Sequence, residues 1–263
     1  MLQSLNTAST GMAAQQYNLD VISNNLANVN TTGFKSQRAE FEDLTYQTPQ
    51  VSGTTNTSTA VQPTSVQVGM GANFVASVTN FTQGALSQTG NTYDMAINGA
   101  GFFMVTLSDG STAYTRDGNF QTDSAGNLVD DNGNKVSPAI TVPTGAKSIS
   151  IGADGTVSAI LVGSTDPQTI GNIKTAVFPN QGGLTRIGDN LYTASAGSGA
   201  ATITTPGEQG SGSIQQSYLE GSNVSVVDEM VRMIMAQRAY EINSKVVQTG
   251  DQMLSMTDNL RGS

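Results

Sequence analysis

Two stripes of apolar residues, one at each end of the chain, restrict the possible folds more than any other feature of this sequence. Their positions recur at alternating steps of three and four residues. In residues 1–29 they are Leu5, Ala8, Met12, Leu19, Ile22, Leu26 and Val29, interrupted by Gln15. Near the C-terminus they are Met235, Ala239, Ile242, Val246, Met253, Met256 and Leu260, interrupted by Thr249. On a helix this spacing gives one narrow apolar face, as in the seam of a coiled coil.

A single amphipathic helix usually packs its apolar face onto its own globular domain. Matching stripes at opposite ends, around a middle region of different character, favour another arrangement. We predict that the two terminal helices pair with each other and with neighbouring copies of the chain. The stripe residues would then form an assembly seam.

The middle of the chain has the pattern of short strands separated by turns. Asp109-Gly110 stands between the β-forming runs at residues 102–107 and 112–115, which predicts a hairpin. Further Asp-Gly, Ala-Gly and Asn-Gly pairs punctuate short β-forming runs up to residue 178. Short strands at this spacing indicate an all-β domain, a barrel or a sandwich, over roughly residues 90–215.

A polar segment rich in Thr, Ser, Gln and Asn lies between the first helix and the β region, at residues 45–67. It fits a flexible linker or a long hairpin equally well. The expected fold is therefore α+β, with paired terminal coiled-coil helices and a central all-β domain. The expected divisions are an N-terminal helix at 1–32, an extended segment at 33–75, the β domain at 76–221 and a C-terminal helix at 222–263.

Composition excludes several classes of function. The chain has no Cys, His or Trp and a formal net charge of −9. Without His or Cys, triads based on these residues and zinc sites built from them are impossible. The acidic balance argues against nucleic acid as a partner. No apolar run is long enough to span a membrane, and the first residues lack the pattern of a cleaved secretory signal.

Two groups of residues resemble chemical sites, and each has a simpler explanation. Asp123, Asp130 and Asp131 lie in Gly/Asn-rich turns, but Lys135 stands where a calcium-binding EF-hand loop needs Gly. Turn formation explains these residues better. Gly99 and Gly101 precede a strand and not a helix, so a phosphate-binding loop is not expected. We predict no catalytic residues, metal or cofactor.

Four motifs in the sequence resemble those of the bacterial flagellar rod and hook protein family. They are NNLANVNTTGFK at 24–35, NGAGFFMV at 98–105, the segment from Tyr114 to Val136, and the segment from Ser222 to Leu254. The first motif ends the N-terminal helix and turns the chain. We call this part the family turn; its residues are Asn24, Asn25, Asn28, Gly33, Phe34 and Lys35. The motifs stand in the family's order and span nearly the whole chain, so the resemblance is highly specific.

Within this family, FEDLTYQT at 41–48, the polar insert and VGMG at 68–71 are most similar to the subunits of the distal rod. The resemblance implies a structural subunit that polymerises into a rigid hollow tube and transmits torque to the hook. In that interpretation the insert stiffens the rod. The residues assigned to this role are Thr48, Pro49, Val51, Pro63, Val66 and Gln67. A proximal rod or hook-type subunit is the alternative.

The resemblance also implies partners and a location. The chain would leave the cell through the flagellar type III export apparatus, without a cleaved signal peptide, and assemble in the periplasm as part of the basal body. Besides copies of itself, it would contact proximal rod proteins, the hook protein, the rod cap and the surrounding L and P rings. It would not be an integral membrane protein.

Overall fold

The computed structural model describes residues 2–50, 55–57, 60–61, 65–163 and 166–261, and its chain divides into two compact units. We call the first, made of residues 1–27, 37–78 and 225–263, the helical unit. The second, made of residues 28–36 and 79–224, is called the β unit. The chain therefore enters the β unit briefly at 28–36 before it returns to the helical unit. The extended segment 37–78 groups with the helices.

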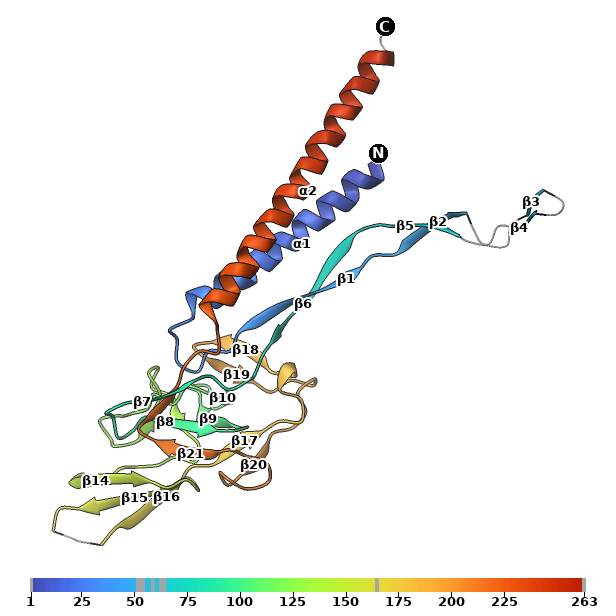
Figure 1. Ribbon diagram of the computed structural model, residues 1–263. Helices are drawn as coiled ribbons and strands as arrows, with labels where there is room; N and C mark the ends of the chain where they lie inside the picture. Colours follow the sequence, from blue (N-terminus) through green and yellow to red (C-terminus); the bar gives the residue numbers. More distant parts are fainter. Residues whose placement is uncertain (1, 51–54, 58–59, 62–64, 164–165, 262–263) are drawn as a thin grey trace. The chain divides into compact units, whose positions relative to one another are not determined.

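Two helices that lie side by side form the centre of the helical unit: α1, Leu2–Ala27, and α2, Val226–Arg261 (Figure 1). They run antiparallel, because Gly11 lies beside Asn243 whereas Gly250 lies beside Leu5. A methyl group added to Gly250 would lie 2.7 Å from Cδ2 of Leu5, so glycine here permits a close approach of the helices. Within the described residues, neither helix has the length and apolarity needed to cross a membrane.

The described residues between 37 and 79 form a long two-stranded hairpin (Figure 1). Its successive pairs are β1 (Gln37–Asp43) with β6 (Ala72–Thr79), β2 (Tyr46–Gln50) with β5 (Val66–Gly69), and β3 (Thr55–Thr57) with β4 (Ala60–Val61). Where the sequence allowed a linker or a hairpin, the described residues thus adopt the hairpin. Near its base, the Phe74 ring stacks on Tyr17 of α1, with ring centroids 4.9 Å apart.

The β unit is built from short strands whose described pairings are all antiparallel. Their bounds are β7 Leu86–Gln88, β8 Met95–Asn98, β9 Phe102–Thr106, β10 Thr112–Thr115, β11 Gln121–Thr122, β12 Leu128–Val129, β13 Lys135–Val136, β14 Ala146–Ile151, β15 Thr156–Leu161, β16 Gln168–Asn172, β17 Thr175–Val177, β18 Thr185–Gly188, β19 Leu191–Thr193, β20 Thr202–Thr204, β21 Ser213–Gln216 and β22 Tyr218–Glu220, with a short 3₁₀ helix at Gln181–Gly183. The main sheet has the order β11-β12-β13-β9-β10-β19-β18, and β17 joins β9 to β20.

Smaller sheets complete this unit. They are β14-β15-β16, β21-β8 and β22-β7. The last two pair strands far apart in the sequence, so the segment just before α2 closes the β unit. The sequence prediction of an α+β chain with a central β-rich region is confirmed.

The sequence of strand β9 contains FFMV, in which apolar residues do not alternate with polar ones. Phe103 and Val105 lie in one buried cluster with Phe120, whereas Phe102 and Met104 lie in a second buried cluster. Successive side chains of a strand point to opposite faces, so both faces of this strand are covered. The predicted hairpin at Asp109-Gly110 is confirmed by the antiparallel pairing of β9 with β10.

Candidate assembly interface

The predicted stripe on α2 is mostly exposed in the single chain. The exposed fractions are 66% for Met235, 61% for Ile242 and 61% for Met256. Val246 and Met253 are also exposed, and Ala239 is half-buried. Leu260 belongs to α2, but its side chain is outside the described residues. Large exposed apolar patches are typical of interaction surfaces, so this stripe is a candidate for one.

The predicted stripe on α1 has a different environment. Ile22 is buried, and Leu5, Met12, Leu19 and Leu26 are half-buried. Val29, also half-buried, lies just beyond the end of the helix. Helix α1 contacts both α2 and β1, so most of its surface already has partners within the chain.

The face of α2 that packs on α1 is a neighbouring one. It contains Ala236, Asn243 and Gly250, whose side chains are small or polar. Steps of three and four residues define which side chains share a face, but not which partner covers that face. This second face carries no large apolar side chains, so a pattern of large apolar residues does not reveal it. The signal that could have found it is the spacing of small residues.

The family turn connects α1 to the hairpin. The side chain of Asn25 is fully buried and bonds the backbone of Gln37 at both ends: Nδ2 donates to the carbonyl at 2.7 Å, and Oδ1 accepts from the N–H at 2.8 Å. Asn24 lies in the last turns of α1, and Asn28 follows the helix and accepts the backbone N–H of Thr31 at 3.2 Å. Of the three asparagines, Asn25 thus satisfies polar backbone groups with its side chain, whereas Asn28 accepts through its backbone carbonyl.

The next three motif residues enter the β unit. Gly33 has φ +67°, and a methyl group on it would lie 2.6 Å from the backbone nitrogen of Asp117, so only glycine fits. Phe34 is buried under the guanidinium of Arg186, whose carbon lies 5.1 Å from the ring centroid. Lys35 is fully buried.

Lys35 belongs to a buried charge cluster with Glu220 and Arg116. Its Nζ lies 2.5 Å from Oε1 of Glu220, and NH1 of Arg116 lies 3.2 Å from Oε2. Burial lowers the pKa of Lys35, and the ion pair with Glu220 opposes that shift. Burial also lowers the pKa of Arg116. A buried carboxylate shared by two cations is stable only when its lone pairs are satisfied.

Backbone groups supply further hydrogen bonds to this cluster. Lys35 donates to the carbonyl of Thr82 at 2.8 Å, and the N–H of Gly84 donates to Oε1 of Glu220 at 2.8 Å. Arg116 donates to the carbonyl of Gly99 at 2.8 Å. The cluster therefore fixes the two segments of the β unit that continue covalently into the helices. Sequence reasoning singled out Lys35 but not its partners, since these stand 81 and 185 positions further along the chain.

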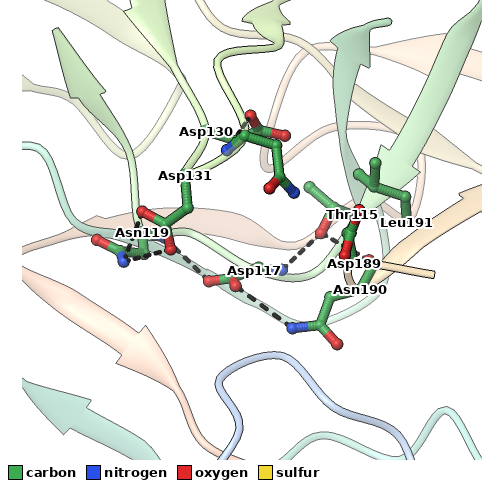
Figure 2. A pocket seen from close by; sticks show the side chains of 9 residues that line it. Thr115, Asp117, Asn119, Asp130, Asp131, Asp189, Asn190 and Leu191 are labelled. Carbon is green, nitrogen blue, oxygen red and sulfur yellow. Dashed lines mark hydrogen bonds between the residues drawn. The ribbon is translucent and has the colours of Figure 1, made fainter.

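An acidic hollow in the β unit was the remaining chemical candidate (Figure 2). It is lined by Asp117, Asp130, Asp131 and Asp189, among others. Burial raises the pKa of Asp117, whose carboxylate also accepts a hydrogen bond from Thr32 at 3.0 Å. Among the described residues, no group of acidic side chains is arranged to hold a metal ion.

Asp123 and Asp130, two of the three residues considered as calcium ligands, form hydrogen bonds within their own turns. Oδ1 of Asp123 accepts the backbone N–H of Asn127 at 2.7 Å, and Oδ1 of Asp130 accepts that of Asn134 at 2.7 Å. In each turn, Oδ2 accepts the side-chain amide of the same asparagine. The predicted turn role of Asp123 and Asp130 is confirmed.

Asp123→Ala is expected to lower the melting temperature near neutral pH but not in acid. Hydrogen bonds from Asn127 hold the pKa of Asp123 below its ordinary value of 3.8. A carboxyl group with a lowered folded-state pKa stabilises the fold above its unfolded pKa, and this contribution is lost as the pH falls through the folded pKa. Thermal unfolding by circular dichroism near neutral pH and at about pH 2 measures both values.

Asp131→Ala is the matched control for that variant. Asp131 accepts only side-chain amides, from Asn119 at 2.9 Å and Gln121 at 3.2 Å, on an exposed surface. We expect a nearly unchanged melting temperature. An equal decrease in melting temperature in the two variants would contradict the stabilising role assigned to Asp123 in its turn.

The structure places the insert residues in the hairpin. Thr48 and Pro49 belong to β2, and Val66 and Gln67 to β5. Val51 and Pro63 lie outside the described residues. Any stiffening role of the four described residues would therefore act through the hairpin.

Comparison with known families covers both ends and the middle of the chain. Residues 5–35 match the model described as flagella basal body rod protein. Residues 96–159 match the flagellar hook protein FlgE/F/G D1 domain, and residues 215–260 match the flagellar basal body rod FlgEFG protein C-terminal model. The first and last matches cover most of the two helices, and the middle one contains strand β9.

Relatives that are similar over their full length show to which family the chain belongs. The flagellar basal-body rod protein FlgG of Caulobacter vibrioides is 51% identical over 99% of this chain and 100% of its own length. The chain belongs to the flagellar basal-body rod protein family. Another member, FlgG of Bacillus subtilis, is 42% identical over 99% of this chain and 100% of its own length. The rod protein FlgF of Caulobacter vibrioides is 36% identical over 87% of this chain.

Proposed function

We propose that this rod-family chain is a structural subunit of the distal rod of the flagellar basal body, and that it is not an enzyme. The main support for this proposal is the 51% sequence identity, over the full length of the relative, to a flagellar basal-body rod protein FlgG. The identity to FlgF is lower, at 36% over a shorter span, which supports the distal rod over a proximal rod subunit.

Assembly would use the exposed stripe of α2. An apolar stripe that remains exposed on a single chain is stabilised when another surface removes it from water, by about 25 cal/mol for each Å² of apolar area buried. We propose that helices of neighbouring copies cover the stripe in coiled-coil fashion. Tightly interlocked apolar side chains resist deformation, which suits a rod that transmits torque.

The buried charge cluster would support this mechanical role. Lys35, Glu220 and Arg116 hold the segment that follows α1 and the segment that precedes α2. The covalent connections of the two helices to the β unit run through these segments, so part of a force applied to the helices reaches the β unit there. Fixing both of them at one buried carboxylate would limit their independent motion.

The partners follow from the family. We propose copies of this chain, proximal rod proteins, the hook protein, the rod cap and the L and P rings as neighbours in the periplasm. Delivery by the flagellar type III export apparatus belongs to the same proposal.

Deletion of residues 48–67 tests the assignment to the distal rod. In this interpretation the hairpin stiffens the polymer through lateral contacts between copies. We expect the deletion to give a polymer that bends more easily than the wild type, as judged by the curvature of negatively stained particles in electron micrographs. A straight polymer with unchanged curvature would argue against the stiffening role of the insert.

A matched control keeps the chain length and tests composition alone. Replacement of the same residues by a Gly/Ser segment of equal length retains a flexible connection but removes the strand-forming residues. The proposal requires this variant to behave like the deletion. A wild-type rod from the replacement would show that the hairpin is dispensable.

A further inference from the structure

The most exposed methionine side chains among the described residues are concentrated on one helix. They are Met230, Met235, Met253 and Met256, and all of them lie on α2. Met12, Met70 and Met233 are half-buried, and Met95 and Met104, in the β unit, are buried. A reagent that attacks thioether sulfur atoms from solvent therefore meets α2 first.

Three of the four exposed methionines belong to the apolar stripe of α2, and the fourth does not. At about 100° per residue, Met253 lies in line with Met235 along the helix, and Met256 lies about 60° away. Met230 lies about 140° from Met235, on another side of the helix. Its exposed fraction of 51% is between the 45% of Met253 and the 66% of Met235. Met230 is therefore a natural control, equally accessible but outside the stripe.

Peroxides oxidise accessible thioethers of this kind. The methionine sulfur attacks one oxygen of hydrogen peroxide, so an S–O bond forms as the O–O bond breaks. The transferred oxygen gives up its proton to the departing hydroxide, which leaves as water. Sulfur loses two electrons and the peroxide gains them, so no further reactant is needed. The product is methionine sulfoxide, which is polar where the thioether was apolar.

A sulfoxide on the stripe lacks a hydrogen-bond donor once water is removed. The other stripe residues of α2 are apolar except for Thr249. The hydroxyl of Thr249 already donates to the backbone carbonyl of Lys245 at 2.8 Å. In the single chain the sulfoxide oxygen remains hydrated, so the fold is unaffected. Burial of the same oxygen without a donor is unfavourable.

We propose that Met235, Met253 and Met256 form an oxidation-sensitive site that decides whether a subunit can assemble. Peroxide converts them to sulfoxides in the unassembled chain, and the oxidised chain does not polymerise until the sulfoxides are reduced. This inference rests on the proposed function, because it requires the stripe to be buried between copies.

Treatment of the purified, unassembled chain with hydrogen peroxide tests the inference. Peptide mass spectrometry should locate added oxygen on the three stripe methionines and on Met230, but not on Met95. Sedimentation gives the lowest protein concentration at which polymer forms. Each buried, unsatisfied acceptor weakens a contact roughly fivefold, so three of them should raise this concentration about a hundredfold. The helix signal in circular dichroism should stay unchanged.

Two variants separate the stripe from the rest of the chain. Leucine has nearly the volume of methionine but no sulfur, so replacing all three stripe methionines with Leu keeps the surface apolar. This triple variant should polymerise like the wild type both before and after peroxide treatment. Met230→Leu should remain as sensitive to peroxide as the wild type.

Enzymatic reversal tests the site without any substitution. A pair of methionine sulfoxide reductases, one for each epimer, restores the thioether. A dithiol is the reductant: its two thiols become a disulfide, and the sulfoxide oxygen leaves as water. The chain has no cysteine, so the dithiol itself does not alter it. Polymer formation should return to its original concentration.

The outcomes distinguish this inference from the proposed function. Normal polymerisation of a chain that carries all three stripe sulfoxides overturns the inference and leaves the proposed function intact. So does a chain that stays unassembled after its sulfoxides have been reduced, or a loss of helix signal on oxidation. An untreated wild-type chain that never forms a sedimentable polymer, at any concentration, overturns both.

Discussion

Replacing Glu220 with Gln is expected to lower the free energy of unfolding of the β unit by about 3–5 kcal/mol. The substitution keeps the shape of the side chain but removes the single negative charge between Lys35 and Arg116. Two cations would then remain buried and would repel each other. Urea unfolding followed by near-UV circular dichroism gives the free energy, and its midpoint should fall with little change in slope.

Lys35→Met provides an internal comparison. It leaves the Arg116–Glu220 pair, which has no net charge, and replaces the ammonium by an apolar group of similar length. Since buried ion pairs can be replaced by apolar groups at small cost, we expect a smaller loss than for Glu220→Gln. A double-mutant cycle between the two positions should show strong coupling.

Glu40→Gln is the matched surface control. Glu40 pairs with Arg38 at 2.8 Å, but both side chains are well exposed, so the change should lie within about 0.5 kcal/mol of wild type. The role proposed for the cluster would be wrong if Glu220→Gln were as mild as this control.

Ile242→Asp is expected to abolish polymerisation without unfolding the single chain. Ile242 is 61% exposed on α2, so an aspartate there remains hydrated in the monomer. In the polymer the same carboxylate would be buried against apolar side chains without a partner. A cost of about 4 kcal/mol per contact would raise the concentration needed for assembly about a thousandfold.

Sedimentation and circular dichroism separate the two effects. The variant should keep the wild-type helix signal while it loses the pelleted fraction, and cells that carry it should be non-motile. Gln237→Asp introduces the same charge on an exposed position of α2 away from the stripe and should assemble. Leu26→Asp is less informative, because Leu26 is already half-buried in the single chain. Normal assembly of the Ile242 variant would contradict the stripe as an interface.

Some structural details could be foreseen from local signals because they depend on neighbours in the sequence. The hairpin at Asp109-Gly110 follows from turn chemistry between two β-forming runs, and it forms as expected. Asp123 and Asp130 act in turns for the same local reason. The hydroxyl of Ser225 accepts the N–H of Asp228 at 3.4 Å, as a residue that caps the start of α2 does.

Other features depended on contacts that local patterns do not contain. The polar segment at 45–67 has no apolar alternation, so only its observed pairing distinguished a hairpin from a linker. The buried carboxylate of Glu220 has no unusual sequence neighbours that would mark it. Its significance comes from Lys35 and Arg116, which lie 185 and 104 positions away along the chain.

The sequence by itself determined that the ends of this chain are helices, that its middle is β-rich, and that its motifs place it in the flagellar rod family. Only the tertiary structure decided that α2 turns Ala236, Asn243 and Gly250 towards α1 and leaves its large apolar stripe uncovered. The physical reason is that a periodic pattern fixes which side chains share a face. The choice of partner for each face depends on how closely two backbones can approach, and small residues set that distance.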